Sequence, residues 1–340
     1  MNTAAASGLP RRKVPPFVWE MPGRSLNGEL PGDHRTTGRR SMPLWNDYLC
    51  PQTLSQALSA LAADPVGSRL VAGGTDLLLD LQQKRLPPVN TLIDVTQIPE
   101  LSVIELRQDR LFIGAAVPLN RLVASPLVQE HAQALYEACC LVGGPQVRNQ
   151  ATLGGNVAHA LPAADGTIAL LALAAQAEIA EQDGTRCLDL IELFVGPGRS
   201  ILAQQPKLIT GFYLLLTSLQ TASAFRRIMR PQGVALPILN MAVWLRRQDN
   251  AISEIRLTVG PGGPVPTRLP QTEVILRGQV PTQALLRQAT NFLLSEAHFR
   301  TSPHRASASF RQHLAGVLLE QTILAAWDRT FPPNAGTNTG

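Results

Sequence analysis

Gln146–Leu173, with the sequence QVRNQATLGGNVAHALPAADGTIALLAL, is the stretch around which the chain is organised. Gly, Asn, Thr and Asp converge here directly before an apolar run, Ile168–Leu173. We expect a tight backbone turn before that run, and Asp165 at the start of an apolar helix. The residues of the predicted turn are Thr152, Gly154, Gly155 and Asn156.

An upstream stretch, LVAGGTDLLLDLQQK from Leu70 to Lys84, repeats this chemistry with Gly73-Gly74, Thr75 and Asp76. Glycine lets backbone N–H groups approach a ligand closely, and successive N–H groups form a nest for anions. One Gly-Gly pair is more often an ordinary turn, but two loops with matching hydroxyl, amide and acid groups predict a ligand with phosphates.

The phosphates would be faced by the hydroxyl groups of Thr75 and Thr152 and by the amide group of Asn156. Asp165 would accept hydrogen bonds from ribityl or ribose hydroxyls. Neither loop has the GxGxxG or GxxxxGK[ST] pattern, which disfavours a Rossmann nicotinamide domain and a P-loop.

The composition predicts a globular protein of two domains, since 340 residues exceed one typical core and 45% are hydrophobic against 16% charged. Residues 1–41 carry seven Lys/Arg and three Asp/Glu, a net +4 of the total +5. The remaining body is nearly neutral, so we do not expect a nucleic-acid partner.

No catalytic or metal site is expected within this chain. The four cysteines, Cys50, Cys139, Cys140 and Cys187, include no CxxC pair, which disfavours a zinc or iron–sulfur site. No apolar run reaches the ~18 residues of a membrane span. The N-terminus lacks the apolar segment of a signal peptide, so the cytoplasm is the expected location.

We expect residues 1–41 to be a disordered extension rich in Pro, Gly, Arg and Ser, with Met42 an alternative translation start. A first domain covers 42–218, a second covers 219–328, and a tail covers 329–340. Secondary structure is predicted from period and turn signals. The expected elements include hairpins around 108–109 and 182–185, paired strands at 235–246 and 251–259, and helices at 128–142, 282–297 and 307–329. A further helix is expected after Pro51, with Leu54, Ala57, Leu58 and Leu61 on one apolar face.

Five segments in this order resemble the FAD-binding medium subunit of molybdenum hydroxylases, the xanthine dehydrogenase and carbon monoxide dehydrogenase relatives. The resemblance covers about Leu44 to Ala326 and is specific in the order of its motifs. The segments are AGGTDLLLDLQQK (72–84), IDVTQIPEL (93–101), IGAAVPLNRL (113–122), VGGPQVRNQATLGGNVAHALPAADGTIALLAL (142–173) and TRLPQTEVILRGQ (267–279), with RASASFR (305–311) following.

The resemblance implies an α+β fold: a two-subdomain FAD-binding fold of the PCMH, vanillyl alcohol oxidase-like type, then a small α+β C-terminal domain. By this likeness two glycine loops grip the FAD pyrophosphate, and Asp165 holds the ribityl or adenosine part. The implied cofactor-binding residues are Ala72, Gly73, Gly74, Thr75, Asp76, Leu77, Thr152, Gly154, Gly155, Asn156, His159, Asp165, Ile209 and Arg226.

Four departures from the family pattern bear on flavin reactivity. Leu161 replaces the usual Ser of an ASPAAD run, and His159 stands where a small or amide residue is common. LFVGPGRS (193–200) replaces FFxGYRxT, and Arg226 occupies the place of a Lys, keeping the charge beside a flavin with a different donor geometry.

As a subunit of this kind, the protein is implied to collect electrons on FAD and pass them to NAD, a quinone or oxygen. Its implied partners are a molybdopterin-binding large subunit and a [2Fe–2S] small subunit. Arg226 or Arg227 would stabilise negative charge on the reduced flavin. Two other functions stay open: a flavin-poor docking subunit of the same complex, and a stand-alone FAD oxidase.

Overall fold

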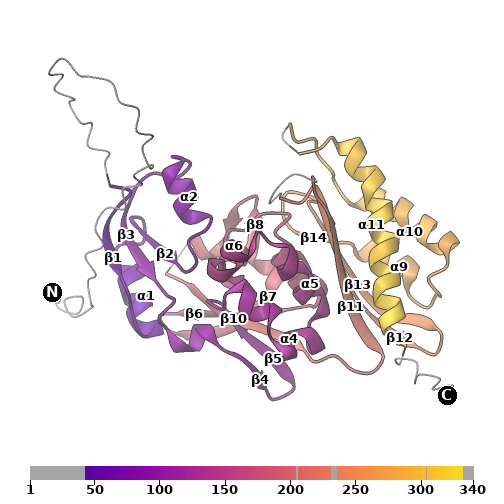
Figure 1. Cartoon of the computed structure of the whole chain (residues 1–340), viewed down its shortest axis with the longest axis horizontal. Helices are drawn as coiled ribbons and strands as arrows, with labels where there is room; N and C mark the ends of the chain where they lie inside the picture. The colour runs from indigo at the N-terminus through magenta and orange to yellow at the C-terminus, as the bar shows by residue number, and fades with distance from the viewer. Residues whose placement is uncertain (1–42, 204–205, 231–235, 304, 332–340) are drawn as a thin grey trace, which may run out of the picture.

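Three larger β-sheets follow one another along the described residues, a fourth sheet has only two strands, and helices fill the layers between and outside the larger ones (Figure 1). The computed structural model describes residues 43–203, 206–230, 236–303 and 305–331. The disorder predicted for residues 1–41 therefore lies outside the described residues, as does the tail from residue 332 onward.

The first sheet is parallel, with the order β1-β3-β2, and it carries the first glycine loop at the end of β2. Helix α1 begins where the side chain of Thr53 accepts from the Gln56 N–H, and it buries Ala57, Leu58 and Leu61, as its apolar spacing predicted. The elements are β1 (Trp45–Leu49), α1 (Leu54–Ala63), β2 (Ser68–Val71), α2 (Leu77–Gln82) and β3 (Val89–Asp94).

The second sheet is antiparallel, with the order β4-β5-β10-β6-β7. Both predicted hairpins are confirmed: β4 pairs with β5 around Gln108, and β6 pairs with β7 around Gln182. The strands are β4 (Ile104–Arg107), β5 (Arg110–Gly114), β6 (Gln176–Glu181), β7 (Gly184–Asp189) and β10 (Leu208–Leu215), with the small hairpin β8 (Phe194–Gly196) and β9 (Arg199–Ser200) after β7.

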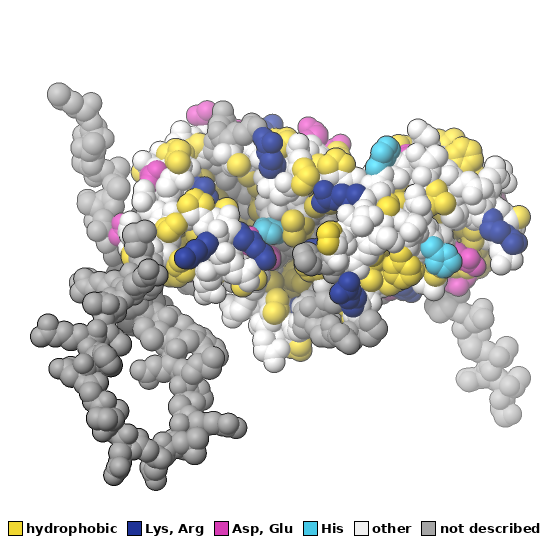
Figure 2. Space-filling model, turned by 90° about the horizontal axis from the view of Figure 1, so that it is seen from above, with side chains coloured by type: hydrophobic (Ala, Val, Ile, Leu, Met, Phe, Trp, Pro, Cys, Tyr) yellow, Lys and Arg dark blue, Asp and Glu magenta, His cyan; other side chains and the backbone are white. Residues whose placement is uncertain are grey.

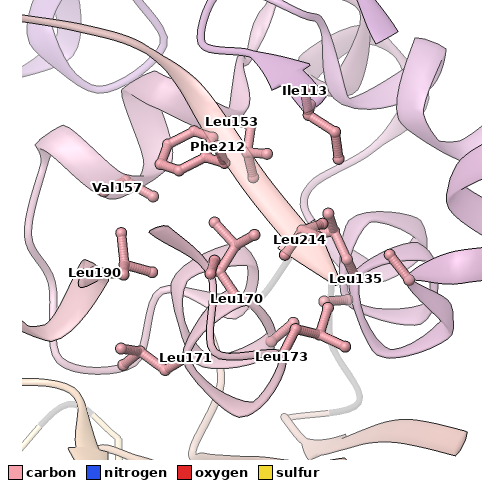
Figure 3. Packing of buried hydrophobic residues seen from close by; sticks show 14 of the residues in the cluster. Ile113, Leu135, Leu153, Val157, Leu170, Leu171, Leu173, Leu190, Phe212 and Leu214 are labelled. Carbon is pink, nitrogen blue, oxygen red and sulfur yellow. The ribbon is translucent and has the colours of Figure 1, made fainter. Parts of the chain in front are cut away.

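Six short helices cover this sheet, and the last of them is buried along its whole length. Leu170 of that α8 segment points toward Phe212 and Leu214 of β10, and Leu171 and Leu173 belong to the same buried cluster (Figure 3). An apolar run without a polar face is what such a position requires. The helices are α3 (Leu119–Val123), α4 (Pro126–His131), α5 (Gln133–Leu141), α6 (Pro145–Gln150), α7 (Leu153–Ala158) and α8 (Asp165–Ala172).

The third sheet is antiparallel, with the order β11-β12-β13-β14, and lies between two helical layers (Figure 1). Helices α5 and α8 pack on one face, and the C-terminal helices cover the other. The strands are β11 (Thr221–Ile228), β12 (Leu239–Gln248), β13 (Ala251–Gly260) and β14 (Thr267–Arg268); the helices are α9 (Pro270–Leu276), α10 (Gln283–Glu296) and α11 (Ala308–Arg329).

Two sequence expectations about local structure need correction. The helix expected over 128–142 is two helices, α4 and α5, that meet at Ala132. The turn expected at 152–156 is the start of α7. The helix expected at 307–329 is confirmed as α11, which ends at Arg329, and the buried Thr330 that follows donates its hydroxyl to the Trp327 carbonyl at 2.7 Å.

Candidate functional site

A cavity of about 1040 Å3 lies where the first glycine loop, the 151–165 segment and the C-terminal domain meet. Its volume is at the upper end of the range of roughly 300–1,000 Å3 for ligand pockets, which suits a large ligand such as a dinucleotide. In Figure 2, Lys and Arg side chains lie around the hollowed middle of this face.

The loop between β2 and α2 lies directly against the chain that leads into α7. A Cβ on Gly73 would stand 1.9 Å from the Gln150 carbonyl oxygen, so only glycine fits there. Gly74 has a φ of +66°, in the left-handed region that favours glycine. The two glycine sequences that we expected to act together are therefore neighbours in space.

The first loop offers the donors that an anion needs. Among the hydrogen bonds of the described residues, none uses the backbone N–H of Gly73, Gly74, Thr75 or Asp76. Consecutive free N–H groups on a loop beside a cavity form an anion-binding nest.

The second loop has a different structure from the predicted turn, because Thr152 is the N-cap of α7. Its Oγ1 accepts from the Gly155 N–H at 3.1 Å, and its carbonyl oxygen accepts from the Asn156 N–H at 3.0 Å. The Leu153 and Gly154 N–H groups donate to the Val117 and Ala115 carbonyls. These amides are thus already satisfied, and this segment can offer a ligand the Thr152 hydroxyl and the Asn156 amide group.

Gly154 and Gly155 differ in what they face. A Cβ on Gly154 would lie 2.6 Å from the Ala115 Cβ, and Gly154 is absent from the cavity lining. Gly155 is exposed in the cavity wall, where a Cβ would meet only the Thr152 Oγ1, at 3.1 Å. Of these two predicted ligand-binding residues, Gly155 lines the cavity, whereas Gly154 packs against Ala115, the residue that follows β5.

Asn156 links α7 to the start of α8. Ala164, the N-cap of α8, has no side-chain acceptor, and the Asn156 Oδ1 instead accepts from the Thr167 N–H at 3.1 Å. This bond fixes the amide plane of Asn156, whose NH₂ group then remains for the cavity.

Asp165 is buried at the first turn of α8 and joins the two domains. Its Oδ2 lies 2.5 Å from the Arg227 Nη1, and its Oδ1 accepts from the Asn240 Nδ2 at 2.6 Å. Burial raises the pKa of the Asp165 carboxyl, against the opposing effects of the Arg227 charge and the Asn240 hydrogen bond. Both carboxylate oxygens of Asp165 thus have protein partners. A ribityl or ribose hydroxyl, the partner that we expected for Asp165, could donate only to a lone pair that these partners leave free.

Besides Gly154, two predicted residues lie away from the cavity. Arg226 and Arg227 alternate on β11: Arg227 lines the cavity, whereas Arg226 bonds to Glu137 of α5 at 3.1 Å and is absent from the cavity lining. Of the two arginines expected beside the flavin, Arg227 is therefore the one in the cavity lining, and Arg226 is not. Ile209 is a core residue of β10 and is absent from the cavity lining. The other predicted residues in the lining are Ala72, Gly73, Gly74, Thr75, Asp76, Leu77, Thr152, Asn156, His159 and Asp165.

The cavity lining is strongly basic, which fits the charge of a pyrophosphate. Among the described residues, six arginines line the cavity, against two carboxylates, Asp76 and Asp165. With the free amides of the first loop and the cavity volume, these residues fit FAD. The arginines are Arg85, Arg227, Arg230, Arg300, Arg305 and Arg311.

Sequence reasoning missed the contribution of the C-terminal domain to this wall. The basic RASASFR stretch supplies Arg305 and Arg311, and the segment before β12 supplies Leu236, Pro237 and Ile238. The arginines of this stretch are visible in the sequence as a basic segment at the start of a helix. Their position at the cavity follows only from the fold.

The described ranges contain no cluster of His, Cys, Asp or Glu arranged to hold a metal ion. Across those same ranges, no helix combines the length and apolar character needed to span a bilayer.

Family models match both domains. Residues 41–214 match the FAD binding domain in molybdopterin dehydrogenase, and residues 223–326 match the CO dehydrogenase flavoprotein C-terminal domain.

The chain is similar over most of its length to subunits of named enzymes. It is 30% identical to the nicotine 6-hydroxylase medium subunit of Paenarthrobacter nicotinovorans, covering 83% of this chain and 98% of that subunit. It is 29% identical to the xanthine dehydrogenase FAD-binding subunit of Escherichia coli O157:H7, covering 81% and 93%.

A solved structure of carbon monoxide dehydrogenase from Hydrogenophaga pseudoflava superimposes with a TM-score of 0.80 at 26% identity, covering 84% of this chain and 98% of that one. Motif order, the two family models and this fold agree with one another. The chain belongs to the family of FAD-binding domains in molybdopterin dehydrogenases, and it is an FAD-binding medium subunit of the molybdenum hydroxylase type.

Proposed function

We propose that this subunit is the flavin end of an electron chain whose other members are a molybdopterin-binding large subunit and a [2Fe–2S] small subunit. The observation that carries the proposal is the basic cavity between the two glycine segments and the C-terminal sheet. FAD supplies the redox chemistry there, exchanging electrons with iron–sulfur clusters and with an external acceptor: NAD, a quinone or oxygen.

The protein's own residues bind and orient the cofactor. The free N–H groups of Gly73–Asp76 and the Thr152 hydroxyl would hold the phosphates, and Asn156 would add an amide donor. The charge of Arg227, held in place by Asp165, would stabilise negative charge that develops on the flavin.

Oxidation of the organic substrate would take place in the large subunit. Within the described residues, the cavity of this chain brings together no nucleophile and base at hydrogen-bond distance of each other. This chain would then contribute cofactor binding and tuning, and the partner subunits would contribute substrate specificity.

A tagged version of this chain, purified from its own cells, tests the proposal. Molybdenum, iron and flavin should elute together, and anaerobic substrate should bleach the flavin band only in the assembled complex. A yellow chain that elutes alone and is bleached by an organic substrate would favour the stand-alone oxidase. A complex that contains molybdenum and iron but no flavin would favour a docking subunit.

A further inference from the structure

Helix α6, Pro145–Gln150, touches both glycine segments, yet none of its six residues is buried. Helices in folded proteins are mostly stabilised by burying an apolar face, so packing does not explain the position of α6. The chain on both sides of the helix nevertheless lines the cavity, with Gly143 before it and Ala151 after it. Hydrogen bonds therefore have to fix this helix.

The C-terminal end of α6 sets the position of both glycine segments. The Gln150 carbonyl oxygen would lie 1.9 Å from a Cβ on Gly73, so the backbone of the first loop rests on this turn of the helix. The next carbonyl, that of Ala151, accepts from the Leu119 N–H at 2.9 Å, and Thr152 follows as the N-cap of α7. A displacement of α6 would therefore move the first loop and the Thr152 hydroxyl, the two groups expected to bind the phosphates.

Arg148 holds the N-terminal side of α6 against the preceding helix. Its Nη1 donates to the Val142 carbonyl at 3.2 Å and to the Gly143 carbonyl at 3.0 Å. Val142 is the C-cap of α5, and carbonyls at the end of a helix lack partners within it, so the guanidinium supplies the missing donor. Both carbonyls belong to residues in the cavity lining, whereas Arg148 itself is absent from the lining.

Asn120 of α3 completes this contact. Its Oδ1 accepts from the Arg148 Nε at 3.1 Å, which orients the guanidinium. Its Nδ2 donates to the Pro145 carbonyl at 3.3 Å and to the Asn149 Oδ1. We call Arg148 and Asn120 the clamp. The clamp joins α3, the end of α5 and α6 through side-chain hydrogen bonds.

We propose that Arg148 and Asn120 are positioning residues for FAD. The clamp fixes α6, and α6 fixes the distance between the free N–H groups of the first loop and the Thr152 hydroxyl. Donors that are already in place bind a phosphate more tightly, because the ligand does not have to order them. The clamp also fixes Val142 and Gly143 in the cavity wall, so it limits the motion of a bound flavin. This inference rests on the proposed assignment of the cavity to FAD.

Variants of the clamp separate its geometry from its charge. Arg148→Met removes the donors and the charge and keeps most of the side chain's length. Arg148→Lys keeps the charge but lacks the planar set of donors, so it should behave like Arg148→Met. Arg148→Met/Asn120→Ala should bind FAD about as weakly as Arg148→Met alone, because both changes release the same helix. The control is Arg121→Met on α3, whose guanidinium donates to the Ser102 carbonyl at 2.8 Å and is absent from the cavity lining.

FAD affinity and the mobility of the bound flavin are the two quantities to measure. The FAD-free full chain is titrated with FAD and followed by flavin fluorescence, and the fluorescence anisotropy of bound FAD is measured with protein in excess. We expect Arg148→Met to bind FAD about tenfold more weakly, with a lower anisotropy of the bound flavin. Arg121→Met should match wild type in both measurements.

Wild-type FAD affinity and anisotropy in Arg148→Met would overturn the inference. An unchanged anisotropy beside a lowered urea midpoint would also overturn it, because it would show a contribution to stability alone. Wild-type affinity in Arg148→Lys would assign the effect to charge and would overturn it too. If Arg148→Met does not fold, Arg148→Lys and Asn120→Ala carry the same test. A wild type that binds no FAD would instead refute the assignment of the cavity, so the two failures are distinguishable.

Discussion

Gly154 and Gly155 are sequence neighbours with different packing. Gly154→Ala would bring a Cβ to 2.6 Å from the Ala115 Cβ, so we expect a loss of about 1–3 kcal/mol in the free energy of unfolding. Gly155→Ala meets only the Thr152 Oγ1, and alanine is the better helix former, so its change should lie within about 1 kcal/mol of wild type. Urea unfolding of the FAD-free proteins measures both, and equal destabilisation would contradict these positions.

Asp165 is the residue whose replacement should be most costly. Asp165→Ala leaves the Arg227 guanidinium buried without its carboxylate, which costs about 3–5 kcal/mol. In Asp165→Ala/Arg227→Met the unpaired charge is gone, so the loss should be smaller than in Asp165→Ala alone. Denaturant titration of the three proteins decides this, and a double variant less stable than Asp165→Ala would show that the pair is not the cause.

Strand β11 places its two arginines in different environments. Arg227→Gln should lower FAD retention, because Arg227 lines the cavity and holds Asp165. Arg226→Gln should leave FAD retention unchanged, because Arg226 bonds to Glu137 and is absent from the cavity lining. The ratio of flavin absorbance to protein absorbance after gel filtration measures retention. A greater loss in Arg226→Gln would contradict the strand's orientation.

Glu137 of α5 connects to β11 and α11, and this contact should depend on pH. Burial raises the pKa of Glu137, but hydrogen bonds from Arg329 and the Phe225 N–H outweigh it and lower the pKa overall. The stabilisation is therefore fully present above the ordinary value of 4.5 and is lost as pH falls through the folded pKa. The stability difference between wild type and Glu137→Gln should shrink from pH 7 toward acid. A difference that stays constant in urea unfolding would exclude this contribution.

These elements also show which structural features could be predicted from the sequence. The apolar spacing of α1 predicted a helix, and the turn residues predicted the two hairpins. Both predictions are confirmed, because they depend on residues close together in the sequence. The turn predicted at Thr152 was wrong because Ala115 and Val117, distant in sequence, hold the segment as a helix. The choice between Arg226 and Arg227 depends on which face of β11 meets α8, and no local pattern supplies that.

At the scale of the whole molecule, the cavity depends on contacts between the two domains. The hydrophobic core around α8 continues into Phe225, Ala242 and Trp244 of the third sheet. The Thr258 hydroxyl donates to the Ile168 carbonyl at 2.8 Å, and Asp165 pairs with Arg227 nearby. The C-terminal domain thus forms one wall of the cavity. The order of the motifs predicted both domains. That the two domains share the wall of one cavity could be seen only in the folded structure.

The FAD content of purified wild type and Gly155→Val, after reconstitution with excess FAD and gel filtration, tests the central claim most directly. Gly155 lies in the cavity wall, and a side chain there meets little of the protein itself. We predict equimolar FAD in wild type and a large loss in Gly155→Val, with an unchanged circular dichroism spectrum. A colourless wild type, or full FAD retention in folded Gly155→Val, would contradict the assignment of this cavity as the flavin site.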